Sequence, residues 1–251
     1  MKCPSNVLIF GATSEIAMHF ARIVVSNGAS VYCIGRNPKK LNFLLDDLKV
    51  RAGKDQKILG DIADLANIDL HSDLIDKAFR SLVNVDAILI AHGTLPDQKK
   101  CEEDNSYGLH EINNNGISTI SLLNLVSKKL EFQRFGTIAV ISSVAGDRGR
   151  QSNYFYGAAK GMVSIYLQGL RNRLHSKNVN ILTVKPGFVN TPMTKHIRRK
   201  NFLWSEPELV AKGIVKGILR GRNIVYLPGY WFFIMLVIKL IPENIFKKLR
   251  F

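Results

Sequence analysis

The stretch "NVLIFGATSEIAMHFARIVVSNG", residues 6–28, joins an apolar run to a helical pattern through one glycine. The run 6–10 is typical of a buried strand, and residues 14–28 are amphipathic, with Gly28 as the expected helix stop. A glycine such as Gly11 at a strand-to-helix turn lets backbone N–H groups approach a pyrophosphate. The stretch therefore predicts the start of a βαβ unit, although Glu15 and Ala17 replace the further glycines of a dinucleotide-binding turn.

Similar apolar runs recur along the chain, separated by helical patterns. We predict further strands at residues 30–35, 56–60, 86–91, 136–142 and 180–186. Such alternation predicts an α/β fold: a single doubly wound, Rossmann-type parallel sheet with helices on both faces. A later helix is expected over 205–218, opened by a capping box from Ser205 to Glu208. We divide the chain into a catalytic domain, residues 1–226, and an apolar and basic extension with a helix, residues 227–251.

Composition and charge limit the cellular compartment, the kinds of metal or disulfide site and the kinds of partner that the chain is expected to have. Three scattered cysteines argue for free thiols in a reducing compartment, and no metal site is expected. The first apolar run is too short for a signal peptide, so a cytoplasmic location is predicted. The net charge is +15, and residues 195–251 hold 12 basic residues against 3 acidic ones. This asymmetry indicates nucleic acid, a membrane surface or a phosphorylated substrate as partner, with solubility alone as the alternative.

Residues at the ends of the second and third predicted strands indicate which nicotinamide cofactor the chain binds. Arg36 stands where an acidic residue would bind the ribose 2′-hydroxyl of NAD, and an arginine there suits the 2′-phosphate of NADP. Asp61 follows the next strand, where its carboxylate is expected at the adenine edge. We therefore predict NADP(H) over NAD(H), with a solvated loop cation as the alternative for Arg36.

The segment "SNYFYGAAKG", residues 152–161, places Tyr156 and Lys160 four residues apart. On a helix these side chains share a face, and the ammonium is expected to lower the pKa of the phenol. The small residues between them are expected to leave that face open to a flat group. For an isolated pair of this kind, the alternative is a solvated surface pair.

Seven motifs resemble, in order, those of the short-chain dehydrogenases/reductases. They are "GATSEIA", "GDIAD", "IAHG", "EINNNG", "ISSVAG", "YGAAK" and "PGFVNTP". The strongest element is the spacing of thirteen residues from Ser143 to Tyr156, followed by Lys160. His92 replaces an asparagine of the family pattern, so we interpret it as a structural turn residue, with a catalytic histidine as the alternative.

The resemblance implies roles for individual residues. Tyr156 would be the general acid/base, Lys160 would lower its pKa and hold the nicotinamide ribose, and Ser143 would bind the substrate oxygen. Asn113 would support a water of the proton relay, with Asn114 and Asn115 as alternatives. Thr191 would meet the nicotinamide carboxamide. The implied cofactor-binding set is Gly11, Thr13, Ser14, Ile16, Arg36, Asp61, Ile62, Ala91, Gly93, Tyr156, Lys160, Pro186, Val189 and Thr191.

A narrower resemblance concerns the substrate. "ILIAHGTLPDQ", "ISSVAGDRGRQSNYFYGAAKG" and "KPGFVNTPMT" look like the branch containing decaprenylphosphoryl-2-keto-erythropentose reductase. That branch implies a keto sugar on a polyprenyl phosphate and a partner flavin oxidase in the same pathway. Cations for the phosphate would come from two clusters, with solvated cations as the alternative. The clusters are Arg148 with Arg150, and Lys195 with Arg198, Arg199 and Lys200.

The C-terminal extension holds an apolar run of about a dozen residues that begins at Tyr230, too short to cross a bilayer. We expect it in the membrane interface, with Trp231 at the headgroups and Lys247, Lys248 and Arg250 on anionic lipid; an interface of a homo-oligomer is the alternative.

The sequence thus predicts an NADP(H)-dependent ketoreductase at the inner face of the membrane, homo-oligomeric and without a nucleic-acid partner. A reductase of 3-oxoacyl or other lipid ketones, and a scaffold without catalysis, are the rival functions.

Overall fold

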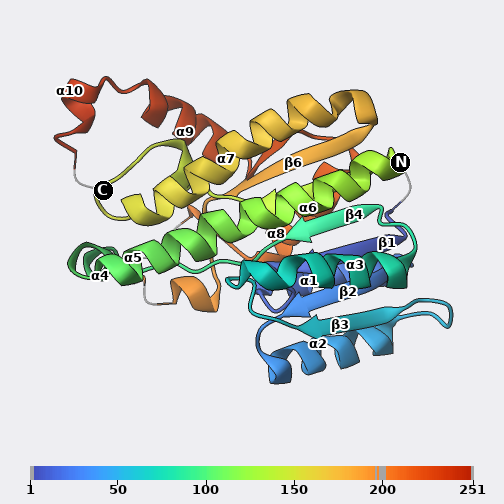
Figure 1. The fold of residues 1–251 in the computed structure, drawn as a ribbon. Helices are drawn as coiled ribbons and strands as arrows, with labels where there is room; N and C mark the ends of the chain where they lie inside the picture. The colour runs from blue at the N-terminus through green and yellow to red at the C-terminus, as the bar shows by residue number, and fades with distance from the viewer. Residues whose placement is uncertain (1–2, 196, 198–201, 250–251) are drawn as a thin grey trace.

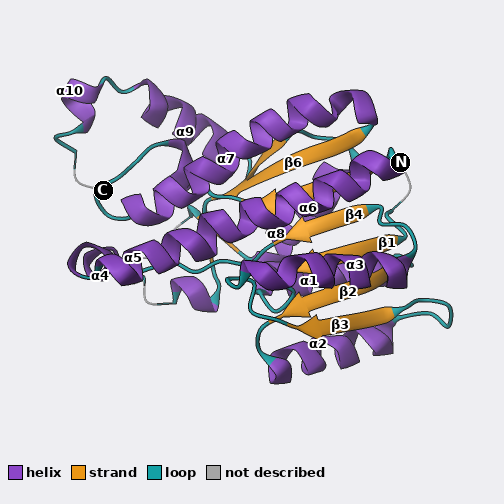
Figure 2. Ribbon diagram, in the orientation of Figure 1, coloured by secondary structure: helices purple, strands orange, loops and turns teal. Residues whose placement is uncertain are grey.

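The computed structural model describes residues 3–195, 197 and 202–249. Seven parallel strands form one sheet in the order β3-β2-β1-β4-β5-β6-β9 (Figures 1 and 2). They are β1 (Asn6–Phe10), β2 (Ser30–Gly35), β3 (Ile58–Ile62), β4 (Ala87–Ile90), β5 (Gly136–Ile141), β6 (Val179–Pro186) and β9 (Ile224–Leu227). Two short strands, β7 (Phe188–Val189) and β8 (Trp204–Ser205), pair separately.

Helices cover both faces of this sheet because its strands are apolar on both sides. Along β1, Val7 and Ile9 enter the hydrophobic core beneath one helix layer, whereas Leu8 and Phe10 enter the core beneath the other. The first layer comprises α1 (Glu15–Ser26), α2 (Pro38–Arg51) and α8 (Pro207–Leu219). The second comprises α3 (His71–Leu82), α6 (Ser118–Gln133) and α7 (Tyr154–Leu174). The predicted doubly wound α/β fold is confirmed.

Shorter helices lie between these elements. They are η1 (Ile68–Leu70), α4 (Gln98–Glu103), α5 (Asn105–Ile112), the π-helix η2 (Asn113–Ile117), η3 (Val144–Asp147), η4 (His175–Lys177), η5 (Pro192–Thr194), α9 (Trp231–Leu240) and α10 (Glu243–Phe246). Figure 1 shows α9 and α10 at one extremity of the molecule, away from α2.

Most local predictions are confirmed, and the differences have physical causes. Ser14 caps α1 by accepting a hydrogen bond from the backbone N–H of Ala17, a contact that the sequence analysis did not predict. The capping box predicted at Ser205 is wrong: α8 begins at Pro207 after Glu206, and the Ser205 hydroxyl donates to the Glu206 carbonyl instead. Strand β9 was not predicted, because four residues at a sheet edge give too short a pattern.

The C-terminal extension folds back onto the main body. Its boundary, predicted after residue 226, falls inside β9, which pairs with β6. Beyond β9, Trp231 and Met235 of α9 are buried with Val144 of η3 in a third, small hydrophobic cluster. Phe188 and Tyr226 pack against the same cluster. The extension therefore contacts the loop that follows Ser143.

Candidate active site

A cleft of about 640 Å³ opens at the carboxyl ends of the strands. In a parallel sheet, ligands bind at this edge where the strand order reverses, here between β1 and β4. The turn after β1, the end of β2, the loop after β4, the start of η3 and the N-terminal part of α7 all contribute lining residues.

Gly11 shapes the floor of the cleft at the turn between β1 and α1. Its φ is +73°, a conformation that favours glycine. A Cβ atom at this position would lie 2.5 Å from the backbone nitrogen of His92, in the loop after β4. The glycine therefore lets two loops from neighbouring strands touch, and it leaves the N-terminus of α1 facing the cleft.

The structure brings most of the predicted cofactor-binding residues to the cleft. The lining includes Gly11, Thr13, Ser14, Ile16, Arg36, Ala91, Gly93, Tyr156, Lys160, Pro186, Val189 and Thr191. Asp61 and Ile62 are not among the lining residues. The Asp61 carboxylate instead accepts hydrogen bonds from the Tyr32 hydroxyl and the Lys77 ammonium, so the prediction of Asp61 at the adenine edge is corrected. Asp64 and Leu65, three and four residues later, line the cleft.

Helix α7 carries Tyr156 and Lys160 and lies close against η3. A Cβ atom on Gly157 would lie 2.9 Å from the carbonyl oxygen of Ala145. Gly157 and Ala159 are buried, the first against η3 and the second beside Gly116 of η2. These two small residues therefore serve contacts of α7 and do not leave that face open, which the sequence analysis expected. Directly after the neighbouring strand β5, the Ser142 hydroxyl donates to the Lys160 carbonyl at 3.0 Å and fixes this turn of α7.

The cleft brings together the side chains of Ser143, Tyr156 and Lys160, and their surroundings determine which of them carry protons. The Ser143 oxygen accepts a hydrogen bond from the Ala145 backbone N–H at 3.1 Å. Burial raises the pKa of the Tyr156 phenol to about 12, and a hydrogen bond with Ser143 opposes that rise. Burial also lowers the pKa of Lys160 to about 8, and its ammonium lies 5.7 Å from the centre of the Tyr156 ring. At neutral pH both groups carry their protons. The phenol is thus a proton donor, and its pKa lies above its usual value rather than below it.

The predicted asparagine needs a correction of register. The Asn113 side chain donates to the Ala66 carbonyl at 3.0 Å and is not part of the cleft lining. Asn114 and Asn115, the two alternatives, line the cleft from the π-helix η2. The Asn115 amide oxygen accepts from the Thr94 backbone N–H at 2.9 Å and so fixes the loop after β4. A π-helix shifts side chains around the helix axis, which a motif read without coordinates does not reveal.

His92 is held as a neutral residue. Its Nε2 lies 2.9 Å from the Ser118 hydroxyl, and burial followed by the charge of Lys160 lowers its pKa to about 3. This environment suits the structural turn residue that the sequence favours.

Two arginines near the substrate end of the cleft behave differently. Arg148 donates to the carbonyls of Ile238 and Ile241, both at 2.6 Å, pairs with Glu243 and stacks on Phe246. Its charge therefore binds the C-terminal extension and is not available to a substrate phosphate. Arg150 lines the cleft, its Nε is buried without a hydrogen-bond partner, and burial lowers its pKa. Among the described residues no salt bridge involves Arg150.

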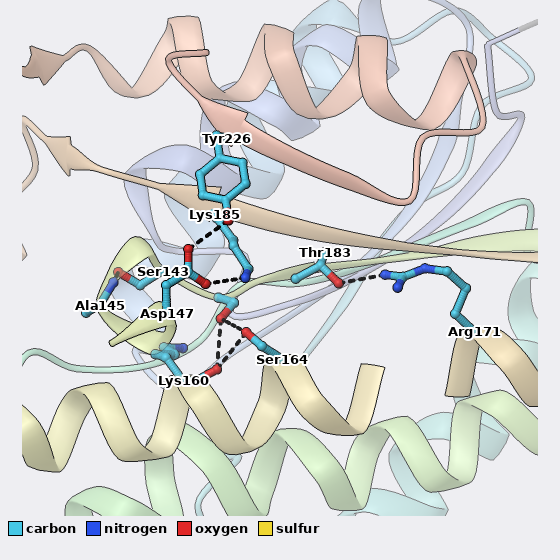
Figure 3. A network of polar contacts seen from close by, with 10 residues as sticks. Ser143, Ala145, Asp147, Lys160, Ser164, Arg171, Thr183, Lys185 and Tyr226 are labelled. Carbon is cyan, nitrogen blue, oxygen red and sulfur yellow. Dashed lines mark hydrogen bonds and ion pairs between the residues drawn. The ribbon is translucent and has the colours of Figure 1, made fainter. Parts of the chain in front are cut away.

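A buried ion pair supports the same end of the site. The Lys185 ammonium at the end of β6 donates to the carboxylate of Asp147 in η3, and Tyr226 of β9 donates to the same carboxylate at 2.7 Å (Figure 3). Both charged side chains are buried. Because breaking such a pair leaves an uncompensated buried charge, these contacts fix the loop after Ser143 on the sheet edge.

Two of the polar cleft residues that sequence reasoning missed carry weight in the chemistry of the site. Lys40, in the first turn of α2, lines it four residues after Arg36. Asn153 precedes α7, does not cap it, and holds its side-chain oxygen buried without a partner beside the cleft. The closely spaced basic residues Arg36, Lys39 and Lys40 after β2 are the signal for Lys40, whereas nothing local marks Asn153. Of the predicted second cation cluster, Lys195 is exposed, and Arg198, Arg199 and Lys200 lie outside the described residues, as does Arg250.

Comparison with known proteins supplies the family. The model of the short chain dehydrogenases matches residues 5–201, more than half of the chain. The chain belongs to the short-chain dehydrogenase family. An uncharacterized oxidoreductase of Mycobacterium tuberculosis is 27% identical over 243 residues, which cover 97% of this chain and 96% of that protein. A ketoacyl reductase of Nostoc is 27% identical over 222 residues, covering 85% and 75%. The solved structure of a short-chain type dehydrogenase/reductase from Mycobacterium ulcerans shares the fold, with a TM-score of 0.81 at 19% identity and 98% of each chain covered.

This short-chain dehydrogenase is an NAD(P)-dependent oxidoreductase, and its cleft fits the cofactor. The turn at Gly11 and the N-terminus of α1 offer backbone N–H groups to a pyrophosphate. Gly93 has φ +149°, and a Cβ atom there would lie 3.4 Å from the Lys160 ammonium, so the glycine keeps that ammonium uncovered for ribose hydroxyls. When bound, the nicotinamide supplies the hydride chemistry, and the chain supplies position and proton transfer.

Proposed function

We propose that this short-chain dehydrogenase uses NADPH to reduce a ketone on a phosphate-bearing molecule to an alcohol. Arg150 carries the proposal, because a half-buried guanidinium in the cleft, with a buried Nε that has no hydrogen-bond partner, is suited to an anionic substrate. Burying such a charge is costly unless it is paired, so an anion that enters the cleft recovers part of that cost.

The residues beside Arg150 define the chemistry of the chain itself. Tyr156 holds a proton at neutral pH and is placed to donate it to the carbonyl oxygen of the substrate. Ser143, whose oxygen accepts from Ala145, hydrogen-bonds the Tyr156 phenol, so its hydroxyl is placed to bind the same substrate oxygen and to stabilise negative charge that develops there. Lys160 keeps a positive charge close to the phenol, and this charge stabilises the phenolate left after donation.

We further propose that the substrate is a keto sugar linked to a polyprenyl phosphate. The buried Asn153 side-chain oxygen offers an acceptor to a sugar hydroxyl, and Arg150 offers a donor to the phosphate. The resemblance to the decaprenylphosphoryl-2-keto-erythropentose reductase branch supports the same class. A flavin oxidase that makes the ketone belongs to this proposal as the preceding step.

NADPH is the proposed form of the cofactor. Arg36 follows β2 and Lys40 lies in the first turn of α2, and both line the cleft where a 2′-phosphate would lie. Two cations at this place favour a phosphate over a hydroxyl.

A matched pair of substrates tests the function. Loss of NADPH absorbance is followed with a short-chain polyprenylphosphoryl 2-keto-pentose and with the same ketone lacking the phosphate. Arg150→Met should raise KM for the phosphorylated ketone by about 10–100-fold, since a charge-assisted hydrogen bond contributes about 1.5–3 kcal/mol. The phosphate-free ketone should be unaffected by the substitution, and Arg150→Lys should restore only part of the affinity. Equal effects on both ketones would contradict the role given to Arg150.

A second candidate is reduction of a 3-oxoacyl or other lipid ketone. The apolar side chains of Leu95, Phe188 and Met193 line the cleft, and the Nostoc relative is named a ketoacyl reductase. Turnover of a long-chain 3-oxoacyl thioester that exceeds turnover of the phosphorylated sugar, and that is indifferent to Arg150→Met, would favour this candidate.

A further inference from the structure

Helix α9 has two apolar faces, and only one of them is buried. Lys239 is the only polar residue among its ten. Trp231 and Met235 are buried against η3 and β9. Phe233, Leu236, Val237 and Leu240, which follow one another at helical spacing, are 43–73% exposed. A helix that is apolar all round is normally covered on all sides, so this second face indicates a partner.

The exposed surface extends beyond the helix at both ends. Before it, the Tyr230 hydroxyl donates to the Phe202 carbonyl at 3.1 Å, and the Phe202 side chain is 84% exposed. After it, Ile245 and Leu249 are exposed as well. We call this surface, made of Phe202, Phe233, Leu236, Val237, Leu240, Ile245 and Leu249, the tail surface.

The charges around the tail surface are positive. Lys239, Lys247 and Lys248 are all exposed. The one acidic side chain of the described extension, Glu243, pairs with Arg148 at 3.0 Å. An apolar surface edged by lysines, with aromatic residues at one end, matches the boundary between anionic headgroups and acyl chains.

Arg148 fixes the orientation of α9, and so of the tail surface, relative to the cleft. Its guanidinium holds the carbonyls at the C-terminal end of α9, and η3, which carries Asp147, follows Ser143 directly. On the buried side, Trp231 packs edge-on against Phe188, a residue of the cleft lining, with ring centres 5.6 Å apart. One aromatic layer therefore separates the tail surface from the cleft. Among the described residues no helix is long and apolar enough to cross a bilayer.

We infer that the tail surface docks onto an anionic lipid bilayer, with α9 lying flat in the interface. A second copy of the chain is a poorer occupant, because a two-fold contact between two such surfaces would bring six lysines together. The docking does not depend on the proposed reaction, and it would place the mouth of the cleft beside the lipid from which a lipid-linked substrate is drawn.

Flotation with vesicles tests the docking on the full chain. One set of vesicles is phosphatidylcholine alone, and the other is an equal mixture of phosphatidylcholine and phosphatidylglycerol. The wild type should bind the mixed vesicles, and added salt should weaken the binding. Phe233→Ser with Leu240→Ser should weaken it about 100-fold, as each buried apolar side chain is worth roughly tenfold. The matched control, Phe132→Ser with Ile165→Ser, changes two exposed apolar residues outside the extension and should bind as the wild type.

Each other outcome overturns the inference. The inference is wrong if the wild type fails to bind the mixed vesicles, or if the tail variant, Phe233→Ser with Leu240→Ser, binds them as well as the wild type. It is also wrong if the wild type sediments as a dimer that the tail variant dissociates. Lys247→Glu with Lys248→Glu should lose the preference for phosphatidylglycerol, and an unchanged preference would contradict the anionic component. Turnover of a water-soluble phosphorylated ketone, measured in parallel, reports on the proposed function separately, since the tail variant changes no cleft residue.

Discussion

The two ends of the cleft are built by different means. At the nucleotide end, the turn at Gly11 and the ends of β1 and β2 rest on two large hydrophobic cores and on backbone geometry. At the substrate end, η3 is held by the Asp147–Lys185 pair, by Arg148 and by a cluster with three buried residues. The nucleotide end is thus fixed by the fold, whereas the substrate end depends on a few side chains distant in sequence. The nucleotide end binds a cofactor that is common to the family, whereas the side chains of the substrate end can differ between proteins that act on different substrates.

The largest effect is expected where the two ends meet, at Tyr156. Tyr156→Phe removes the proton donor but keeps the ring, so kcat should fall by about 10²–10⁴-fold. Affinity for NADPH, measured by fluorescence titration, should stay nearly unchanged because the nucleotide end is intact. Ser26→Ala, a change in the last turn of α1, provides a control for expression and handling. Loss of NADPH binding in Tyr156→Phe would show that the two ends are not separable.

The next largest effect tests the backbone of the nucleotide end. Gly11→Ala places a Cβ atom 2.5 Å from the His92 backbone nitrogen at a φ of +73°. The free energy of unfolding should fall by about 2–4 kcal/mol, with a matching loss of NADPH affinity. The matched control is Gly28→Ala, where φ is +93° and no heavy atom lies within 4 Å of the added Cβ. Its cost should be only about 1–2 kcal/mol, and equal costs for both variants would mean that the contact between the loops contributes nothing.

Arg148→Met tests the side-chain contacts of the substrate end. It leaves the carbonyls of Ile238 and Ile241 without their donor, which should cost about 1–3 kcal/mol. Amide hydrogen exchange should accelerate in residues 231–249 while the sheet stays protected. Arg51→Met, which breaks an exposed ion pair with Asp47, is the control and should cost less than about 1 kcal/mol. Uniformly faster exchange across the sheet in Arg148→Met would refute local stabilisation.

The smallest effect concerns cofactor choice. Arg36→Asp should lower the ratio of kcat/KM for NADPH to that for NADH by about tenfold or more, because one cation beside the 2′-phosphate is replaced by an anion. Lys40 remains in the cleft and should preserve some preference. An unchanged ratio would remove Arg36 from the phosphate site, and Lys40→Met would then be the variant to measure.

The same contrast explains what the sequence could predict. Strands β1 and β2 follow from short local patterns, whereas Ser143, Tyr156 and Lys160 follow from the family resemblance, in which their spacing is the strongest element. The use of Arg148 could not be predicted, because its partners lie about 90 residues further along the chain. Asp61 was misplaced because its partners Tyr32 and Lys77 come from other elements, and Asn113 because the π-helix changes which side chains face the cleft.

The position of β9 at the sheet edge has a consequence for the order of synthesis. Synthesis runs from the N-terminus, and β1 to β6, with Ser143, Tyr156 and Lys160, precede β9 and α9 in the chain. The partners of Lys185 and Arg148 in the extension, Tyr226 and the end of α9, are made last. The wall of the substrate end therefore cannot form until residues 224–249 have been made, and premature termination near residue 220 would remove from it Tyr226, which holds Asp147, and Trp231, which packs against Phe188.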